Sequence, residues 1–184
     1  MIQPTQVRIT ASDYFASDDY QNHDLIQLID GEVIITMPPI PKHQFIVGEI
    51  LYLLMTFARK LGGKAATSPI EVYLDENNVY EPDVVYLAPD SQCTVGEKRL
   101  RGAPELVVEV LSPGTARYDR QQKYKAYQKH GVKEYWIVDP VHQTIEVYVL
   151  KEEKFVRQDA YAIDDTFTST VLDSEITVKP LFVS

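Results

Sequence analysis

The sequence predicts an α+β or mixed α/β sheet domain. Short apolar runs of strand character occur near the beginning of the chain, in its middle and toward its end, and two longer stretches with helical spacing lie between them. Helices and strands interspersed in this order indicate helices packed on a sheet. At 184 residues, the chain is expected to form one domain spanning residues 1–184.

The first elements are a short helix and a β-hairpin. The helix is predicted at Ser12–Phe15, with Ser12 as its N-cap. The hairpin consists of the apolar runs Leu25–Ile29 and Glu32–Ile35, joined by Asp30-Gly31. An Asp-Gly pair between two apolar runs is a strong hairpin signal, because the tight turn requires positive φ angles.

Two longer helices separate the remaining strands. Apolar residues recur at helical spacing from Lys42 to Leu61, where Gly62-Gly63 ends the helix. A second helix, rich in Arg and Lys, is predicted at Thr115–Lys129, and a polar, basic loop at Ser91–Gly102. Strands are predicted at residues 69–74, 79–87 (interrupted by Pro82), 106–111, 133–139 and 144–150, with weaker candidates at 154–157, 166–169 and 175–178.

Charge is unevenly distributed along the chain. The net charge of −9 argues by itself against a nucleic-acid partner. Residues 97–133, however, carry a local charge of +5, so the rest of the chain carries −14. The single cysteine excludes an internal disulfide, and no apolar run approaches the roughly 18 residues that span a bilayer. These features predict a cytoplasmic protein without a membrane partner.

One carboxylate, Glu109, stands inside the apolar strand 106–111. An isolated ionised carboxylate there costs several kcal/mol unless it is paired or binds a cation. A second acid, Asp83, follows Pro82, and Lys123 on the next helix shares a face with Asp119 and Tyr127. Mg²⁺ prefers oxygen ligands and often takes one or two carboxylates plus waters, and a nearby lysine can orient or deprotonate a water. Two acids and a lysine therefore suit phosphodiester hydrolysis.

Three segments carry a family resemblance: LIDGEVIITMPPIPKHQ, EPDVVYL and PELVVEVLSPGTARYDRQQKYKAYQKHGVKEYWIVDP. Together they resemble the bacterial family described as "putative restriction endonuclease", within the PD-(D/E)xK nuclease superfamily. The similarity runs from about residue 24 to 150. It implies a restriction-endonuclease-like mixed sheet flanked by helices, with Asp83, Glu109 and the backbone carbonyl of Val110 as ligands of a divalent metal, Mg²⁺ or Mn²⁺.

The sequence departs from the superfamily pattern at one position. The pattern places a lysine two residues after the strand glutamate, where this chain has Leu111. The resemblance suggests that the lysine has moved to the following helix, which makes Lys123 the candidate. Lys125 is a rival, but it faces away from Asp119 and Tyr127.

Five other residues have competing interpretations. His43 is expected to form hydrogen bonds at the helix N-terminus and not to bind metal. Glu49 could face the site, whereas Glu32 could equally be a surface residue of the hairpin. Glu105 is expected to be exposed near the start of its strand, and Cys93 to be incidental.

The leading hypothesis is a metal-dependent endonuclease acting on DNA, with Asp83, Glu109 and Lys123 as catalytic residues. The segment Lys98–Arg101 and the exposed face of the 116–130 helix are expected to contact phosphates. The alternative is an inactive protein that keeps the nuclease fold for binding or oligomerisation. A homodimer is expected, in which an apolar terminal strand at Thr177–Val183 could be exchanged.

Overall fold

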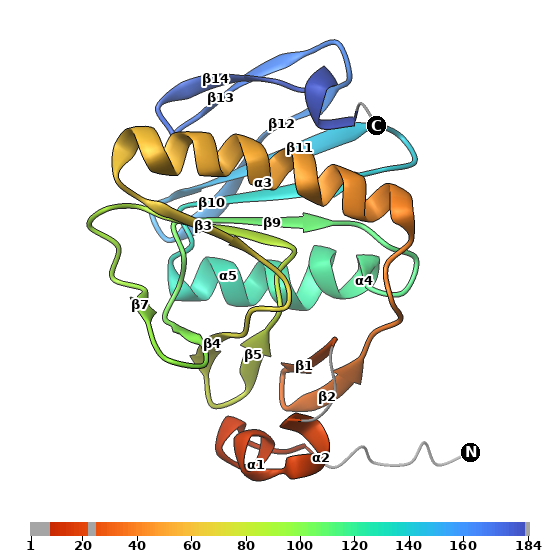
Figure 1. Cartoon of the computed structure of the whole chain (residues 1–184), viewed down its shortest axis with the longest axis vertical. Helices are drawn as coiled ribbons and strands as arrows, with labels where there is room; N and C mark the ends of the chain where they lie inside the picture. Colours follow the sequence, from red (N-terminus) through yellow and green to blue (C-terminus); the bar gives the residue numbers. More distant parts are fainter. Residues whose placement is uncertain (1–7, 22–24, 183–184) are drawn as a thin grey trace.

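The structure is a computed structural model that describes residues 8–21 and 25–182. The first residues of the family resemblance, around Asp24, and Val183 of the proposed terminal strand lie outside this part. Within it, two six-stranded sheets and a two-stranded ribbon are arranged along the long axis, with helices beside them (Figure 1).

The central sheet has the strand order β12-β11-β10-β9-β6-β3. Strands β9 and β10 are parallel and their other neighbours are antiparallel, which confirms the predicted mixed sheet. The short β3, which contains two alanines, was not predicted. The strands are β3 (Lys64–Thr67), β6 (Val84–Leu87), β9 (Leu106–Val110), β10 (Glu134–Asp139), β11 (Thr144–Lys151) and β12 (Lys154–Ala162).

The second sheet, here called the hairpin sheet, contains the predicted hairpin. Asp30 and Gly31 adopt φ angles of 51° and 80°, as the turn between the first two strands requires. The sheet has the order β2-β1-β5-β4-β8-β7. Its strands are β1 (Ile26–Ile29), β2 (Glu32–Ile35), β4 (Val72–Asp75), β5 (Asn78–Tyr80), β7 (Thr94–Val95) and β8 (Leu100–Arg101).

The single strand predicted at 79–87 is wrong, because the chain divides at Pro82. The part before the proline, β5, belongs to the hairpin sheet, and the part after it, β6, belongs to the central sheet. Proline has no N–H to donate to a ladder, so it is suited to the point where pairing stops. Asp83 therefore lies where the chain passes from one sheet to the other.

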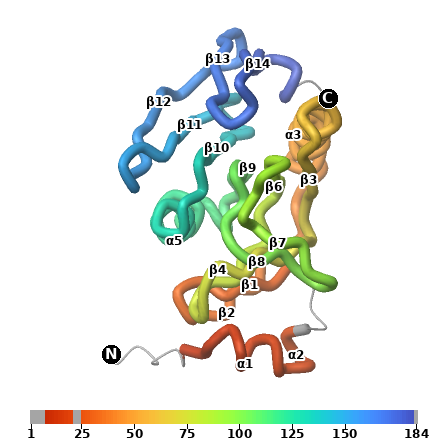
Figure 2. Tube along the Cα trace, turned by 90° about the vertical axis from the view of Figure 1, so that its left-hand side faces the viewer, coloured from red at the N-terminus to blue at the C-terminus, as the bar shows by residue number. Residues whose placement is uncertain are grey.

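Helices cover both faces of the central sheet (Figure 2). The long α3 (Pro41–Leu61) lies on one face and ends at Gly62, which has a left-handed φ of 83°. The other face carries α4 (Ala116–Tyr118), a π-helical turn η1 (Asp119–Lys123) and α5 (Tyr124–His130). The predicted 115–129 helix thus contains one wide turn. Turns of this kind occur frequently at functional sites.

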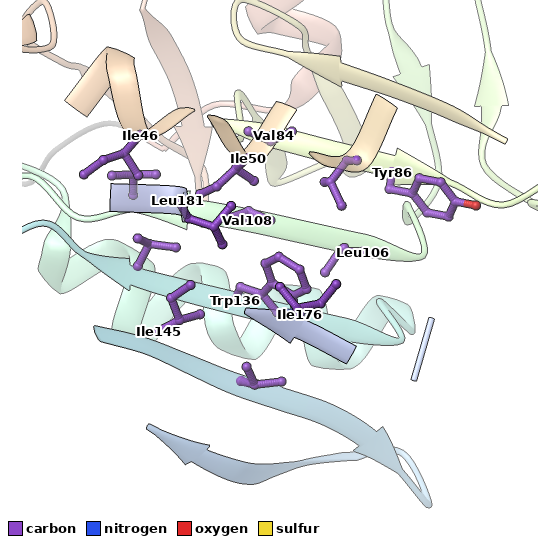
Figure 3. Close-up of a cluster of buried hydrophobic side chains, with 14 of the residues drawn as sticks. Ile46, Ile50, Val84, Tyr86, Leu106, Val108, Trp136, Ile145, Ile176 and Leu181 are labelled. Carbon is purple, nitrogen blue, oxygen red and sulfur yellow. The ribbon is translucent and has the colours of Figure 1, made fainter. Parts of the chain in front are cut away.

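The strands alternate their side chains between these two layers. Leu106, Val108 and Val110 of β9 pack in the cluster that contains Ile46 and Ile50 of α3 (Figure 3). The intervening residues point to the α5 side. Alternation therefore directs Glu109 toward the helix that carries Lys123.

The two ends of the described chain differ from the predictions. Helix α1 (Ala11–Ala16) is capped by Thr10, whose hydroxyl accepts from the Asp13 N–H in a capping box, and not by Ser12. It is followed by α2 (Asp18–Gln21). Near the C-terminus, β13 (Thr166–Ser169) and β14 (Ser174–Thr177) form the ribbon, and η2 (Lys179–Phe182) is a 3₁₀ helix.

The predicted terminal strand at Thr177–Val183 is wrong in its described part, because residues 179–182 form the 3₁₀ helix η2. Leu181 and Phe182 of η2 are buried in the core with α3, and exchange of this segment between two copies stays a prediction. Among residues 8–21 and 25–182, no helix is long and apolar enough to cross a membrane.

Candidate active site

The two predicted metal ligands lie opposite each other on neighbouring strands. Strands β6 and β9 pair with Val84 opposite Val108, and this register places Asp83 opposite Glu109. The backbone N–H of Val110 donates to Asp83 Oδ2 at 2.7 Å, which fixes the carboxylate beside β9. Both acids line a cavity of about 70 Å³.

Lys123 reaches this pair from the π-helical turn. Its Nζ lies 2.9 Å from Glu109 Oε1 and 3.2 Å from Asp119 Oδ1. The hydroxyl of Tyr127 also donates to Glu109 Oε1, at 2.8 Å. Lys123 is 1% exposed and lines the cavity, whereas Lys125 is exposed to solvent. The structure thus brings Asp83, Glu109 and Lys123 together, and their catalytic roles stay a prediction.

The buried charges do not balance. Lys123 supplies one positive charge to a site with four carboxyl groups: those of Glu81, Asp83 and Glu109 line the cavity, and that of Asp119 contacts Lys123. Burial raises the pKa of Glu109 to about 8, and burial also raises the pKa of Asp119. Burial alone would lower the pKa of Lys123, but the carboxylates of Glu109 and Asp119 outweigh it and raise that pKa above its ordinary value. The lysine is therefore protonated, and the site has an excess of negative charge when its carboxyl groups ionise.

His43 lies in the first turn of α3 and forms a hydrogen bond, as predicted, and it also lines the acidic cavity. It is 7% exposed, and its Nε2 lies 2.9 Å from the Val110 carbonyl oxygen and 3.4 Å from Asp83 Oδ2. Burial opposes protonation, but the hydrogen bond to Asp83 and its charge raise the pKa of His43 above the usual value. Its position on the buried stripe of α3, with Ile46, Val47, Ile50 and Leu54, was the sequence signal for an inward-facing side chain.

The other sequence candidates lie elsewhere. Neither Glu49 nor Glu32 is among the residues lining the acidic cavity. The prediction that Glu105 is exposed is wrong: it is 6% exposed, and its Oε2 accepts from the Ala88 N–H. The thiol of Cys93 is buried and donates to the Gly102 carbonyl.

Comparison with known proteins agrees with this architecture. Residues 11–179 match the Uma2 family, described as "Putative restriction endonuclease". The chain belongs to this family. The uncharacterized protein sll1609 of Synechocystis sp. is 25% identical over 150 residues, which cover 80% of this chain and 84% of that protein.

A solved structure extends the likeness of this Uma2-family chain to the whole fold. It is described as a putative nuclease belonging to DUF820 from Anabaena variabilis, with a TM-score of 0.75 and 19% sequence identity. The match covers 95% of this chain and 97% of the other. The predicted restriction-endonuclease-like fold class is thereby confirmed.

The donor atoms of this Uma2 site suit a hard divalent cation. Asp83 and Glu109 supply carboxylates, and both hydrogen bonds to Glu109 are to Oε1, which leaves Oε2 for a cation. Excess negative charge in a buried cavity favours a cation further. Among residues 8–21 and 25–182, no group of three or more His, Cys, Asp and Glu side chains is arranged to hold a metal. Waters would complete the shell, as is usual for Mg²⁺.

The predicted phosphate-binding segment Lys98–Arg101 contributes no residue to the lining of the acidic cavity. Arg99 pairs with Glu71 at 2.7 Å and lies over the ring of Phe15, and Arg101 lies over Tyr73. Strand β7, beside this segment, lies toward the opposite end of β9 from α4 (Figure 1). On the following helical segment, Lys123 contacts Glu109, whereas Arg120 pairs with Glu146 at 2.6 Å.

Proposed function

We propose that the protein is a metal-dependent endonuclease that hydrolyses phosphodiester bonds in nucleic acid, with DNA as its substrate. One observation carries the proposal: Asp83, Glu109 and Lys123, from three separate segments, converge on one small cavity. Membership of the Uma2 family and the likeness to a described nuclease fold support the same class of reaction.

In this proposal, Asp83 and Glu109 hold Mg²⁺ or Mn²⁺ through their carboxylates. When bound, the cation would lower the pKa of an attacking water and neutralise charge on the phosphate. In the proposal Lys123 acts as a cation and not as a base, because the carboxylates of Glu109 and Asp119 raise its pKa. It orients Glu109 and offsets negative charge that develops on the phosphoryl oxygens.

Cleavage of plasmid and of single-stranded DNA tests this function. Asp83→Ala, Glu109→Gln and Lys123→Ala should each reduce metal-dependent cleavage by at least about a hundredfold, the usual consequence of losing one group that stabilises a transition state. Lys151→Ala is the matched control, because it removes the same ammonium from an exposed position at the end of β11, outside the acidic cavity and outside the predicted phosphate-binding face. Equal cleavage by all five proteins, wild type included, would indicate a contaminant or a different site.

A second candidate function is an inactive nuclease fold that serves as a binding or oligomerisation module. The site's own groups favour it: Lys123 and Tyr127 occupy Glu109 Oε1, and His43 is bonded to the Val110 carbonyl oxygen. Calorimetric titration separates the two functions. Absence of Mg²⁺ and Mn²⁺ binding at millimolar concentrations, together with absence of DNA retention at low salt, would support the module.

We also propose that the chain acts as one domain, in the cytoplasm and as a homodimer. Two copies would present two acidic cavities to one nucleic-acid molecule. Sedimentation at micromolar concentration checks the oligomeric state, and a monomer under all conditions would contradict it.

A further inference from the structure

A second cavity, of about 490 Å³, adjoins the acidic one. The two share a wall that includes His43, Ser112 and Thr115. The remaining lining of the larger cavity is mostly apolar and includes Met37, Pro38, Ile40, Leu111, Pro113 and Val141.

Its apolar residues are unusually exposed. Met37 is 85% exposed and Val141 is 81% exposed, and Ile35 and Ile40 are each 65% exposed. The described part of the chain has ten large hydrophobic residues that are exposed, and four of them line this cavity. Exposed apolar groups gathered at one place indicate a binding site more often than single scattered ones do.

The charge and polarity of the lining restrict what can bind. No Asp or Glu of the described part of the chain lines the cavity. Among the same residues, Lys42 is the one Lys or Arg in the lining, and its Nζ donates to the Pro140 carbonyl oxygen at 2.6 Å. Ser112 and Thr115 hydrogen-bond to each other, and the Thr36 hydroxyl donates to the Leu25 carbonyl. The occupant is therefore a flat or compact apolar group that needs no specific hydrogen bond and tolerates nearby negative charge.

The sizes of the two cavities assign them different parts of one substrate. The acidic cavity, at about 70 Å³, has room for a cation and a few waters, since one water needs roughly 10–15 Å³ of such space. It cannot also contain a base. The larger cavity has the size of a small-molecule site, typically about 300–1,000 Å³. A nucleoside attached to a phosphate at the acids would therefore extend into it.

We propose that this cavity binds the unstacked nucleobase next to the scissile phosphate. This proposal rests on the proposed nuclease function and specifies its substrate class: single-stranded, looped or locally unpaired nucleic acid. A base inside an intact duplex is stacked on both sides and cannot enter a cavity unless it is extruded. Because the Thr36 hydroxyl donates to the Leu25 carbonyl and the Ser112 and Thr115 hydroxyls bond to each other, few polar groups of the lining remain for the edges of a base, and we expect weak discrimination among the four bases.

Two neutral substitutions test the apolar contact. Met37→Gln and Val141→Asn replace exposed apolar side chains of the cavity without changing charge. Val95→Asn is the matched control, because Val95 is 56% exposed on β7 and outside the cavity. Each cavity variant should lower kcat/KM on a single-stranded oligonucleotide by up to about tenfold, as expected for losing the burial of one apolar side chain. The control should match the wild type.

A series of oligonucleotides with an abasic site at each position in turn locates the base. Cleavage next to one abasic position should be reduced in the wild type, and at that position the cavity variants should lose no further activity. Fully paired duplex should be cleaved at least tenfold more slowly than single strand. Equal cleavage of intact and abasic strands, equal cleavage of duplex, or cavity variants that behave as Val95→Asn would each overturn the proposal.

The outcome is separable from failure of the nuclease function. If the wild type cleaves nothing, fluorescence titration with an oligonucleotide containing 2-aminopurine still tests whether the cavity binds a base. The proposal would be supported if the wild type binds this oligonucleotide, Met37→Gln weakens the binding and Val95→Asn leaves it unchanged. Absence of binding would overturn it. A wild-type dimer that Met37→Gln converts to a monomer would also overturn it, by assigning the cavity to a second copy of the chain.

Discussion

Replacing Glu109 by glutamine should stabilise the metal-free protein at pH 8 while it removes a proposed metal ligand. The Glu109 side chain is 3% exposed, and burial raises its pKa from 4.5 to about 8. A carboxyl group with a raised pKa in the folded state contributes full stability below about pH 4.5. It loses that contribution progressively as the pH rises toward 8, because the folded protein binds more protons than the unfolded chain.

The size of this stabilisation follows from the shift in the pKa of Glu109. At about 1.4 kcal/mol per pKa unit, ionising Glu109 in the folded state costs up to about 5 kcal/mol. Glutamine avoids this cost but weakens the hydrogen bonds from Lys123 and Tyr127, by about 1 kcal/mol each, because bonds to a charged acceptor are stronger. We therefore expect a gain of about 2–3 kcal/mol at pH 8, equivalent to roughly 5–10 °C in Tm for a chain of this size, and little difference at pH 5.

Urea denaturation of both proteins at pH 5, 6.5 and 8, with EDTA present, measures this effect. The difference in unfolding free energy between Glu109→Gln and wild type isolates residue 109, because the other titrating groups are common to both proteins. A difference that stays constant from pH 5 to 8, or that falls with rising pH, would refute the reasoning. When Mn²⁺ replaces EDTA, the unfolding free energy of the wild type should rise more than that of Glu109→Gln.

Three further predictions concern the surrounding groups. Lys123→Met should lower the unfolding free energy at pH 7 by about 3–5 kcal/mol, because it removes the ammonium that contacts the buried carboxyl groups of Glu109 and Asp119, whereas Lys125→Met should leave denaturation curves unchanged. Glu134→Ala should cost at least about 3 kcal/mol by urea denaturation, because the buried carboxylate accepts hydrogen bonds from the Trp136 indole and from the turn after β13, and these donors would lose their acceptor; stability within about 1 kcal/mol of wild type would contradict this. Mn²⁺ affinity measured by calorimetry should fall as the pH is lowered, because the pKa of His43 is raised and its protonated ring lies beside a proposed metal ligand. His43→Gln should make the Mn²⁺ affinity less dependent on pH. An unchanged pH dependence in this variant would show that His43 does not cause the effect.

Local chemistry made much of the fold predictable. The Asp30-Gly31 turn specifies the hairpin without any distant contact, and Gly62 ends α3 at the expected residue. The division into two sheets was not predictable in this way. It depends on pairing between β1 and β5, strands about 50 residues apart, which no local pattern specifies.

The candidate site was predictable to a similar extent. The family resemblance indicated a lysine on the following helix, and helical spacing favoured Lys123 over Lys125. The structure places Lys123 in contact with Glu109. The hydrogen bonding of His43 was predicted from its position near the start of α3, whereas its place beside Asp83 was not, because that depends on how α3 packs against β9. The wide π-helical turn at Asp119–Lys123 has no clear sequence signal, since Asp, Arg, Gln and Lys are equally compatible with an α-helical turn.

Because the chain passes from the hairpin sheet to the central sheet at Pro82, the charged groups of the site and the opposite wall of its cavity come from different parts of the fold. The acids belong to the central sheet, or directly precede one of its strands, and Lys123 lies on the helical layer that covers it. Residues such as Gln27, Thr36 and Met37, from the hairpin sheet and the segment that follows it, form the facing wall of the acidic cavity. Changes in the hairpin could therefore alter which molecules enter without disturbing the charged groups. Family members could in this way diversify their substrates while they keep the same reaction.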